Sequence, residues 1–415
     1  MVTKCKSKIY RGLFMNAVGI DISKGKSTIC IMRPLGEVVA SPYEVKHTVS
    51  ELSELARTLK KLNGETKVIM ECTGNYHLPV ARYLQTAGFF VSTVNPILIH
   101  DFGNNTIRKR RNDKADSIKI ANYGLTNWLE LPRYLPEEEI RQMLKAFSRQ
   151  YNKYNKVKTM LTNNLTSLLD QTFPALRDLF TSPARETDGH EKWLDFAAQF
   201  WHCECVGSLS LKVFRERYQK WCKRMGYYGV KADEIHAASR QCTAVMPKSE
   251  TTKLLITHAV AQVNAVVETL AVTAREMKKL AELLPEYPVV LAFRGVGEIL
   301  GPQLIAEVGD VRRFQKKSML VAFAGLEPVD DQSGKFQGDE EISKQGSPHL
   351  RKAVFQVMDC LLKHAPADDP VYQFLNRKRK EGKHYYSYMN AGCAKFLRIY
   401  YARVKEYLLE LEHDT

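Results

Sequence analysis

Four acidic residues near the N-terminal end have the types and spacing of a divalent-metal site. Asp21 ends a β-prone run in GIDISK, and Glu71 ends a second such run in KVIME. Asp113 and Asp116 lie three positions apart in RNDKADSIKIA, on one face of a starting helix. Converging carboxylates repel one another unless cations neutralise them, and hard oxygen donors select Mg²⁺ or Mn²⁺. Two such ions about 4 Å apart can activate an attacking oxygen and stabilise the leaving oxygen of a phosphodiester.

Each of these acids alone also has a structural explanation. Asp113 could cap a helix, and Asp116 could add favourable charge to its first turn. Asp21 could satisfy a turn backbone, and Glu71 could pair with an arginine. The order strand-Asp, strand-Glu, helix-Asp-x-x-Asp is more specific than its parts. Beside it lies a basic cluster that could hold a DNA backbone over the metals. The cations of this cluster are Arg108, Lys109, Arg110 and Arg111.

The elements that would position these acids have an α/β pattern. Short β-prone runs are separated by Gly and Pro punctuation, and helix-like segments lie between the later ones. The β-prone runs are 17–23, 28–33, 37–41, 67–71 and 89–95, and the helix-like segments are 52–62 and 78–87. An initial meander followed by alternating helices and strands predicts a mixed sheet covered by helices. We assign residues 1–132 to this domain.

Two long helices are predicted downstream. Apolar residues recur at steps of three and four from Ile140 to Leu168, and again from Ile256 to Leu284. The unbroken alternation in the second run is typical of a coiled coil or a long helical hairpin. We assign residues 133–286 to these helices, with an insertion of no clear period at about 174–250. Residues 287–415 form a third, mostly helical domain that ends in an amphipathic helix.

The composition favours a polyanionic partner. The chain of 415 residues has 61 Lys and Arg against 46 Asp and Glu, a net charge of +15. Neutralising phosphates releases counterions, so nucleic acid fits this excess, although charge alone does not separate DNA, RNA and an acidic membrane surface. No uninterrupted apolar run reaches the ~18 residues that cross a bilayer, and the basic start lacks the apolar region of a secretory signal. We therefore expect a cytoplasmic protein with no membrane association.

The cysteines do not suggest a disulfide framework. Nine of them are scattered along the chain, an odd number that suits a reducing compartment. His202, Cys203 and Cys205 lie close together, with Cys242 downstream. The repeated C-x₂₋₄-C or H-x₃₋₅-H spacing of a structural zinc site is absent there, which disfavours zinc without excluding it.

With these residues in place, the chain resembles the DEDD transposases of bacterial insertion sequences. That group includes the invertase of pilin genes and recombinases guided by a bridge RNA. Near the N-terminus the resemblance rests on GIDISK, MECTGNY, VNP and DKADSIKIA. Near the C-terminus it rests on RGVGEILGPQLIAEVGDVRRF, AGLEPVDDQSGKFQG, ISKQGSPHLRKA and EGKHYYSYMNAGCAKFLRIYY. The middle insertion falls outside it.

The resemblance implies an RNase H-like (RuvC-like) N-terminal domain and a nucleophilic serine in the C-terminal domain. The implied metal ligands and catalytic acids are Asp21, Glu71, Asp113 and Asp116, and the serine maps to Ser333 in QSGK. In the family this serine attacks a phosphate and holds a DNA end covalently, beside a metal site from another subunit. A homodimer or homotetramer is thus implied, with double-stranded DNA at element ends and target as the substrate. A non-coding bridge RNA is a further candidate partner.

The residues around the serine have their own chemistry. A serine hydroxyl is a weak nucleophile until its proton is taken, and a Ser-Gly pair is most often a turn. Asp330 and Asp331 just upstream would repel a phosphate unless they face away or join the metal site. Gly295 and Gly297, with the helix that follows, resemble a helix-hairpin-helix whose amides bind phosphate. A helix cap whose glycines tighten a turn is the alternative.

Basic residues form two further candidate nucleic-acid contacts. The first is a stripe along the first long helix, at steps of four and three, comprising Arg141, Lys145, Arg149, Lys153 and Lys156. This stripe could follow a nucleic-acid backbone, or it could be the flanking charge of a coiled coil. The second lies near the serine and comprises Lys344, His349, Arg351 and Lys352.

The interpretation that unites these features is a DNA transposase or recombinase of a mobile insertion sequence. Three alternatives stay open. A site-specific invertase of the same group would flip a chromosomal segment, and a RuvC-like structure-selective nuclease would use only the carboxylates. A non-catalytic nucleic-acid-binding protein fits the charge but leaves four aligned acids without a purpose.

Overall fold

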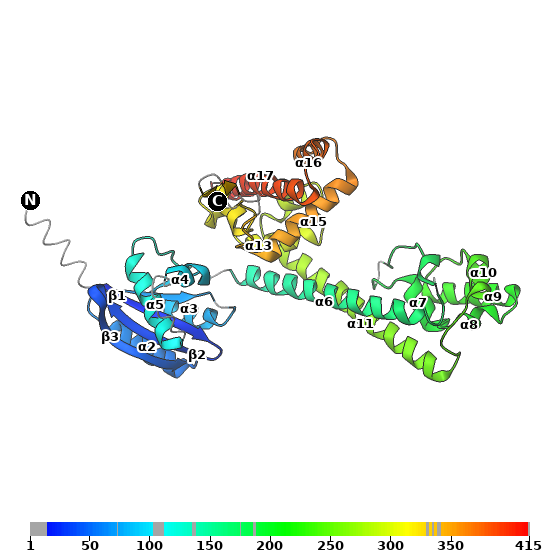
Figure 1. Cartoon of the computed structure of the whole chain (residues 1–415), viewed down its shortest axis with the longest axis horizontal. Coiled ribbons are helices and arrows are strands. Elements are labelled where there is room, and N and C mark those ends of the chain that lie inside the picture. The colour runs from blue at the N-terminus through cyan, green and yellow to red at the C-terminus, as the bar shows by residue number, and fades with distance from the viewer. Residues whose placement is uncertain are drawn as a thin grey trace, which may run out of the picture. The chain divides into compact units, whose positions relative to one another are not determined.

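The computed structural model of the chain describes residues 15–72, 74–102, 112–134, 138–174, 176–185, 188–328, 332–333, 336–337 and 342–413. The chain forms two compact units, Met1–Pro136 and Glu137–Thr415 (Figure 1). The first unit is built on a mixed five-stranded sheet and the second is mostly helical, as the sequence predicts. The second unit contains separate hydrophobic cores at its two ends. The three domain boundaries given above stay a prediction.

The sheet of the first unit has the strand order β3-β2-β1-β4-β5. The first three strands form an antiparallel meander, and β4 and β5 run parallel to β1. The strands are β1 (Met15–Ser23), β2 (Lys26–Arg33), β3 (Glu37–Lys46), β4 (Glu65–Glu71) and β5 (Phe90–Val94). A short helix η1 (Pro34–Gly36) separates β2 from β3. Every strand predicted from the sequence is present, although β3 is longer than expected.

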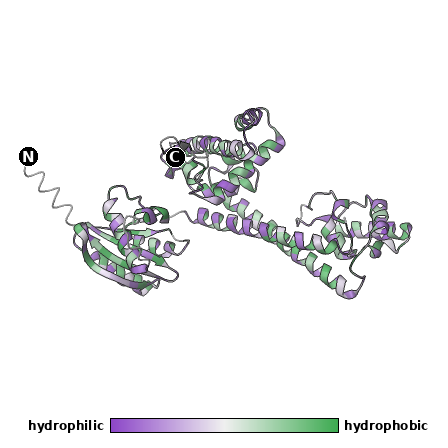
Figure 2. Cartoon of the chain, viewed as in Figure 1, coloured by the Kyte–Doolittle hydropathy of each residue, from purple (hydrophilic) through white to green (hydrophobic). Residues whose placement is uncertain are grey.

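Helices cover both faces of this sheet. The helices are α2 (Val49–Lys60), α3 (His77–Thr86), α4 (Pro96–Phe102) and α5 (Asp113–Thr126). Apolar residues of α2 and α3 pack on the face that carries Val18 and Ile20, whereas α4 and α5 contribute to the core that contains Ala17 and Ile69. Because side chains alternate across a strand, a run such as AVGI is buried on both sides. Figure 2 shows these strands in the green of hydrophobic residues.

Gly19 of β1 allows α5 to approach the sheet at backbone distance. A Cβ added there would lie 2.2 Å from the Ser117 carbonyl oxygen and 2.4 Å from the Ala121 amide nitrogen. Real Cβ atoms do not tolerate such distances, so only glycine fits. One helical turn further along, Gly124 fits against the Ile69 side chain, which a Cβ would meet at 2.5 Å. Two glycines on facing elements therefore fix how α5 lies across β1 and β4.

The second unit begins with two long helices that pack along each other. They are α6 (Glu139–Leu169) and α11 (Glu250–Glu282). They run antiparallel, because Leu144 shares a core with Met277 whereas Leu165 shares one with Ile256. The buried stripe of α11 passes through Val260, Val267 and Ala281. The sequence pattern placed Ala259, Val266 and Leu280 on this stripe instead, one residue too early in each case. It was correct for the other buried positions, which are Ile256, Val263, Leu270, Thr273 and Met277.

The predicted insertion is a small helical module with its own aromatic core. Its elements are η2 (Leu176–Leu179), α7 (Lys192–Gln199), α8 (Glu204–Gly207), α9 (Leu211–Met225) and α10 (Ala232–Gln241). Phe196 lies at its centre, with the rings of Phe200 and Trp221 4.7 and 5.7 Å away between centroids. The helices are short, and aromatic residues of α7 and α9 meet at the centre of this core, so no long apolar period is visible in the sequence.

The C-terminal part of the second unit packs its helices around a core that also includes the ends of α6 and α11. Its elements are α12 (Tyr287–Leu291), α13 (Leu300–Val308), η3 (Val311–Arg313), α14 (Lys317–Phe323), β6 (Gln332–Ser333), β7 (Phe336–Gln337), α15 (Pro348–His364), α16 (Pro370–Lys380) and α17 (Tyr385–His413). From Gly301 to Val308, α13 is buried at every position. It is therefore the central helix of this core.

Within the described part of the chain, α11 is the one helix long and apolar enough in composition to cross a bilayer. The sequence has no uninterrupted apolar run over α11, because polar residues such as His258 and Glu268 lie within it. In the structure α11 packs along α6 and supplies residues to two cores. Core helices of globular proteins often have such a composition.

We predict that Gly19→Ala destabilises the N-terminal unit by about 2 kcal/mol or more, because the added methyl group collides with backbone that cannot rotate away. Amide hydrogen exchange of β1 and α5 should accelerate accordingly. Gly297→Ala is the matched control, since a Cβ at that position meets nothing within 4 Å. Unchanged protection of β1 in the Gly19 variant would contradict the close packing of α5.

Candidate functional site

Asp21 and Glu71 lie at the same level of two neighbouring parallel strands. The register pairs Ile20 of β1 with Met70 of β4, and these two acids are the next residues along each strand. Neighbouring strands are about 4.8 Å apart, and residues at the same level of the pleat point to the same face. Both acids are two residues beyond the paired Gly19 and Ile69. They therefore share the face on which α5 lies.

The direction of α5 brings its first turn to the same place. Gly124 near the end of α5 lies beside the Ala17 side chain, and Ser117 lies against Gly19, so α5 runs antiparallel to β1. Along the strand, Asp21 lies about 6 to 7 Å beyond Gly19. Along the helix, Asp113 lies about 6 Å beyond Ser117 in the same direction. The first turn of α5 thus reaches the strand ends where the other two acids lie.

The electrostatics of Asp21 reflect this convergence. The pKa of its carboxyl is raised from 3.8 to about 6. Burial is the largest cause, followed by the negative charges of Asp113, Asp116 and Glu71 in that order. Burial also raises the pKa of Glu71, with Asp116 adding to the rise and Lys119 opposing it. Three elements that are separate in the sequence therefore bring their carboxylates within range of one another's charge.

The α5 acids are not used to cap the helix. The N-cap is Asn112, whose side-chain oxygen accepts a hydrogen bond from the Ala115 amide at 2.8 Å. Asp113 follows it and is exposed, while Asp116 is half-buried. The capping role that the sequence allowed for Asp113 is thus taken by its neighbour.

The donor set of this site fits a hard divalent cation. In the described residues, none of the four carboxylates has a Lys, Arg or His partner within ion-pair distance. No three His, Cys, Asp or Glu side chains of that same part of the chain already form a metal-sized cage. Carboxylate oxygens that lie near one another without an ion-paired cation are what a divalent ion would draw together.

Lys119 is a residue at this site that the sequence interpretation missed. It follows Asp116 by three positions and so shares its helix face. Its ammonium donates a hydrogen bond to the His100 carbonyl oxygen at 3.0 Å, and its charge lowers the pKa of Glu71. The i+3 spacing from Asp116 was the signal that could have identified it.

Ser333 lies in the second unit, on the two-residue strand β6, where its backbone pairs with Phe336 of β7. The sequence placed it in a loop, and the structure instead gives it a place in a short hairpin. Asp330 and Asp331, just before this serine, lie outside the described residues, as do the nearby glycines Gly334 and Gly338. The nucleophilic role of this serine stays a prediction.

Arg141 was wrongly included among the nucleic-acid contacts. Its guanidinium forms an ion pair with Glu286 in which both side chains are at most 5% exposed. A second bond of this pair measures 3.2 Å. A buried cation that is fully engaged by a buried carboxylate holds α6 against the segment after α11 and is unavailable to a ligand.

The remaining cations have different positions. Arg149 pairs with Glu307 through bonds of 3.1 and 3.2 Å, Lys145 is half-buried, and Lys153 is exposed. Arg351 is half-buried and donates to the Ala324 carbonyl oxygen at 2.8 Å, while Lys344 is exposed with a left-handed φ of 54°. The cluster 108–111 lies outside the described residues.

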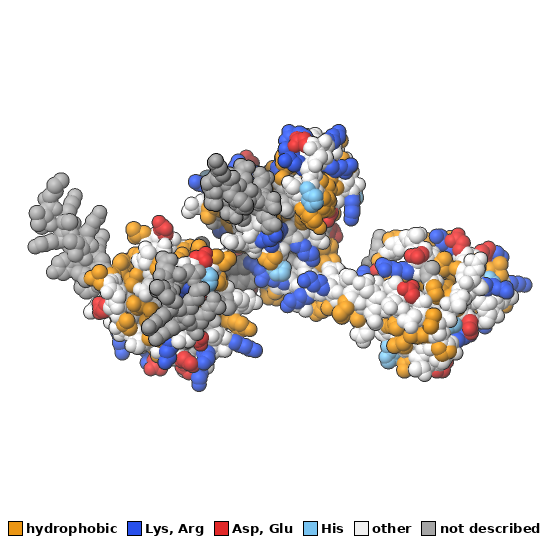
Figure 3. All heavy atoms as spheres, in the orientation of Figure 1, with side chains coloured by type: hydrophobic (Ala, Val, Ile, Leu, Met, Phe, Trp, Pro, Cys, Tyr) orange, Lys and Arg blue, Asp and Glu red, His pale blue; other side chains and the backbone are white. Residues whose placement is uncertain are grey.

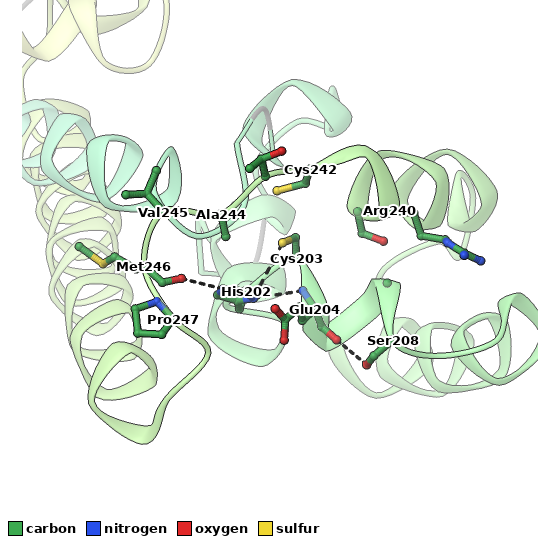
Figure 4. Close-up of a pocket in the computed structure, with 13 residues that line it drawn as sticks. His202, Cys203, Glu204, Ser208, Arg240, Cys242, Ala244, Val245, Met246 and Pro247 are labelled. Atoms are coloured by element: carbon green, nitrogen blue, oxygen red, sulfur yellow. Dashed lines mark hydrogen bonds between the residues drawn. The ribbon is translucent and has the colours of Figure 1, made fainter.

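The group of cysteines and histidine in the middle module lines an open pocket of about 660 Å³. Both ring nitrogens of His202 are engaged: Nδ1 accepts from the Glu204 amide and Nε2 donates to the Met246 carbonyl, each at 3.1 Å. Figure 4 shows Cys203 and Cys242 facing one another beside it. Burial, with the neighbouring Cys203 thiol, raises the pKa of Cys242 to about 12. The Cys242 thiol is thus protonated at neutral pH, and the hydrogen bonds of His202 give no support to zinc.

We predict that Asp21→Asn stabilises the protein in the absence of divalent ions. The folded-state pKa of Asp21, about 6, lies above the ordinary 3.8, so the folded protein binds this proton more tightly and its stability falls as the pH rises through that window. The variant should gain on the order of 1 kcal/mol at about pH 7.5, after allowance for solvent screening, and less at about pH 5.

Thermal unfolding in a chelator, at both pH values, measures this difference. Glu54→Gln on α2 removes an exposed carboxylate far along the chain from the site and should change stability at neither pH. An Asn variant less stable than the wild-type protein at the higher pH would mean that Asp21 is held by favourable partners, not by repulsion.

Comparison with known proteins relates both units to transposases. Residues 18–174 match the family model of the DEDD transposase of IS110, and residues 288–373 match that of the transposase IS116/IS110/IS902 family. A pilin gene-inverting protein of Moraxella bovis is 23% identical over 390 residues, which cover 94% of this chain and 95% of the relative.

Shorter regions match two further relatives. A putative transposase of Sinorhizobium fredii, y4rJ, is 33% identical over 100 residues, which cover 24% of this chain and 25% of the relative. The transposase of insertion sequence element IS1111A of Coxiella burnetii is 33% identical over 89 residues, or 21% and 24% of the two chains.

Proposed function

The chain belongs to the IS116/IS110/IS902 family of transposases, and on that premise we propose that it cuts and rejoins double-stranded DNA through a serine-linked intermediate assisted by divalent cations. The observation that carries this proposal is the convergence of Asp21, Glu71 and the first turn of α5 at one end of the sheet. Burial, and then neighbouring carboxylates, raise the pKa of Asp21 and of Glu71, and acids placed in this way suit cations that in turn bind phosphate.

In this proposal the four acids hold Mg²⁺ or Mn²⁺, and such ions would polarise the scissile phosphate and stabilise the leaving oxygen. Asp21 and Glu71 supply rigid donors, because Asp21 lies within β1, Glu71 ends β4, and the residues before both acids are buried. Asp113 and Asp116 supply donors from a helix turn that Gly19 holds against the sheet. The Lys119 charge partly opposes the rise in the pKa of Glu71 that burial and Asp116 cause, and so favours its ionised form.

The serine step conserves bonds. The Ser333 oxygen forms a bond to phosphorus while the bond from phosphorus to one deoxyribose oxygen breaks, and the hydroxyl proton ends on the leaving oxygen. A hydroxyl from a second DNA end then attacks the serine-bound phosphorus, and the serine recovers its proton. The number of phosphodiester bonds is unchanged, so no external energy source is required.

We infer from the family resemblance that this reaction is carried out by a homodimer or homotetramer, in which one subunit would supply the metal site beside the serine of another. Exposed apolar side chains on the two long helices support an interface there. They include Met143, Met160, Leu254, Leu255 and Val272. A bridge RNA is proposed as a further partner on the family resemblance alone.

A second candidate function is site-specific DNA inversion. It is favoured by the relative that matches over nearly the full length, whose name describes inversion of a pilin gene. Both functions use the same break and rejoin chemistry, so the DNA that flanks the gene would separate them. A structure-selective nuclease that uses only the acids would form no covalent bond between the protein and DNA.

We predict that Asp21→Ala lowers recombination by about 100-fold or more across a Mg²⁺ titration, because the loss of a metal donor removes several kcal/mol of transition-state stabilisation. In the same assay, Ser333→Ala should abolish strand transfer and leave DNA binding intact. The readouts are recombinant product, DNA retention and a covalent adduct mapped to a residue by mass spectrometry.

Ser343→Ala and Asp101→Ala serve as matched controls on the serine and on the acid, and both should recombine like the wild-type protein. Recombination by Ser333→Ala at the wild-type level would remove this serine from the mechanism. Cleavage without any covalent adduct would favour the nuclease.

A further inference from the structure

We propose that a basic patch where α6 lies beside α15 binds the sugar-phosphate backbone of duplex DNA. This α6–α15 patch consists of Arg149, Lys153, Lys156, His349 and Lys352. The choice of DNA as the polyanion rests on the proposed function, whereas the patch itself rests on contacts between described residues. Figure 3 shows Lys and Arg side chains gathered around a histidine over the end of α6 that lies beside the C-terminal helices.

Hydrogen bonds tie the two helices together at this patch. The Lys352 ammonium donates to the Asn152 side-chain oxygen at 2.6 Å, which links α15 to α6 directly. Arg149 is held by Glu307 of α13, and the Ser347 hydroxyl donates to the same carboxylate at 3.3 Å. Glu307 is only 2% exposed, so this network sits on a fixed, buried base.

The charges of the patch exceed what the buried carboxylate can neutralise. Burial, and then the Lys156 charge, lower the pKa of Lys352. Burial also lowers the pKa of His349, Glu307 opposes this, and the cations Arg149, Lys352 and Lys156 add to the lowering. Like charges held at this range raise the free energy of the unbound protein, and a bound anion would relieve the repulsion.

The alternative explanation for the stripe, flanking charges of a coiled coil, does not account for these residues. Elsewhere on α6, Lys158 pairs with Glu191 at 2.9 Å in the manner expected of such charges. Lys153 and Lys156 are exposed and have no acidic partner within ion-pair distance among the described residues. The patch is therefore a surplus of positive charge.

A polymer fits this surface better than a small anion. From Arg149 to Lys156 the cations extend about 10 Å along one helix face, and the second helix widens the row. Duplex DNA carries a charge about every 1.7 Å of its axis, so such a row spans several phosphates at once. Contacts of this kind position a duplex and do not read its sequence.

The test is a salt titration of duplex binding by the full chain. The double variant Lys156→Ala/Lys352→Ala should weaken binding to a generic duplex about tenfold or more and reduce the slope of log K against log salt by about 2. The matched control, Lys220→Ala/Lys223→Ala, removes two exposed cations of α9 and should leave the affinity and slope unchanged.

Wild-type affinity and slope in the patch variant, or an equal loss in the α9 control, would overturn the proposal. A loss confined to a structured RNA, with duplex DNA binding unchanged, would overturn the assignment to DNA. A recombination assay of the wild-type protein separates the DNA-binding proposal from the proposed function. If the wild-type protein binds DNA through the patch yet recombines no substrate, the proposed function fails and the DNA-binding proposal stands.

Discussion

The contact of α5 with β1 at Gly19 is the constraint on which the candidate site depends. A helix normally lies well above a sheet because side chains separate the two, and here one position has no side chain at all. The helix backbone descends onto the strand, and its first turn then reaches the level of Asp21. Since β4 runs parallel to β1 in a fixed register, Glu71 lies at the same level as Asp21, and the strand pairing alone is enough to place it there. The repulsion among these carboxylates follows from the packing, and it creates the demand for cations.

The second unit handles charge in the opposite way. Buried ion pairs, Arg141 with Glu286 and Arg149 with Glu307, fasten α6 to the segments around it. The surplus cations are left on the surface where α6 and α15 meet. One unit thus concentrates negative charge at a strand edge, and the other presents positive charge on helices. In the proposed reaction, cation-loaded acids would act at one phosphate while basic helices would hold neighbouring phosphates.

Much of the first unit could be predicted from the sequence, because short β-prone runs and the punctuation by Gly and Pro are local signals. The four acids were found for the same reason, since each ends or begins a recognisable element. The role of Gly19 could not be found, because a close approach is a tertiary property of a residue that carries no side chain. Arg141 was misplaced because a cation at helical spacing looks the same whether its partner is a distant buried Glu or a ligand. On α11, Val266 was predicted to be buried in place of Val267 because the two residues are equally apolar, and only the neighbouring helix decides between them.

The central claim is that the four acids form one site for a divalent cation. Binding of Mn²⁺ to the full chain, followed by electron paramagnetic resonance, tests it most directly, with Glu71→Gln compared against the wild-type protein and an exposed-acid control. Saturable binding that is lost in Glu71→Gln and kept in the control is the expected result, because removing one strand-end donor breaks the shared site. Saturable binding that persists unchanged in Glu71→Gln would contradict the account, since the ion would then be held elsewhere.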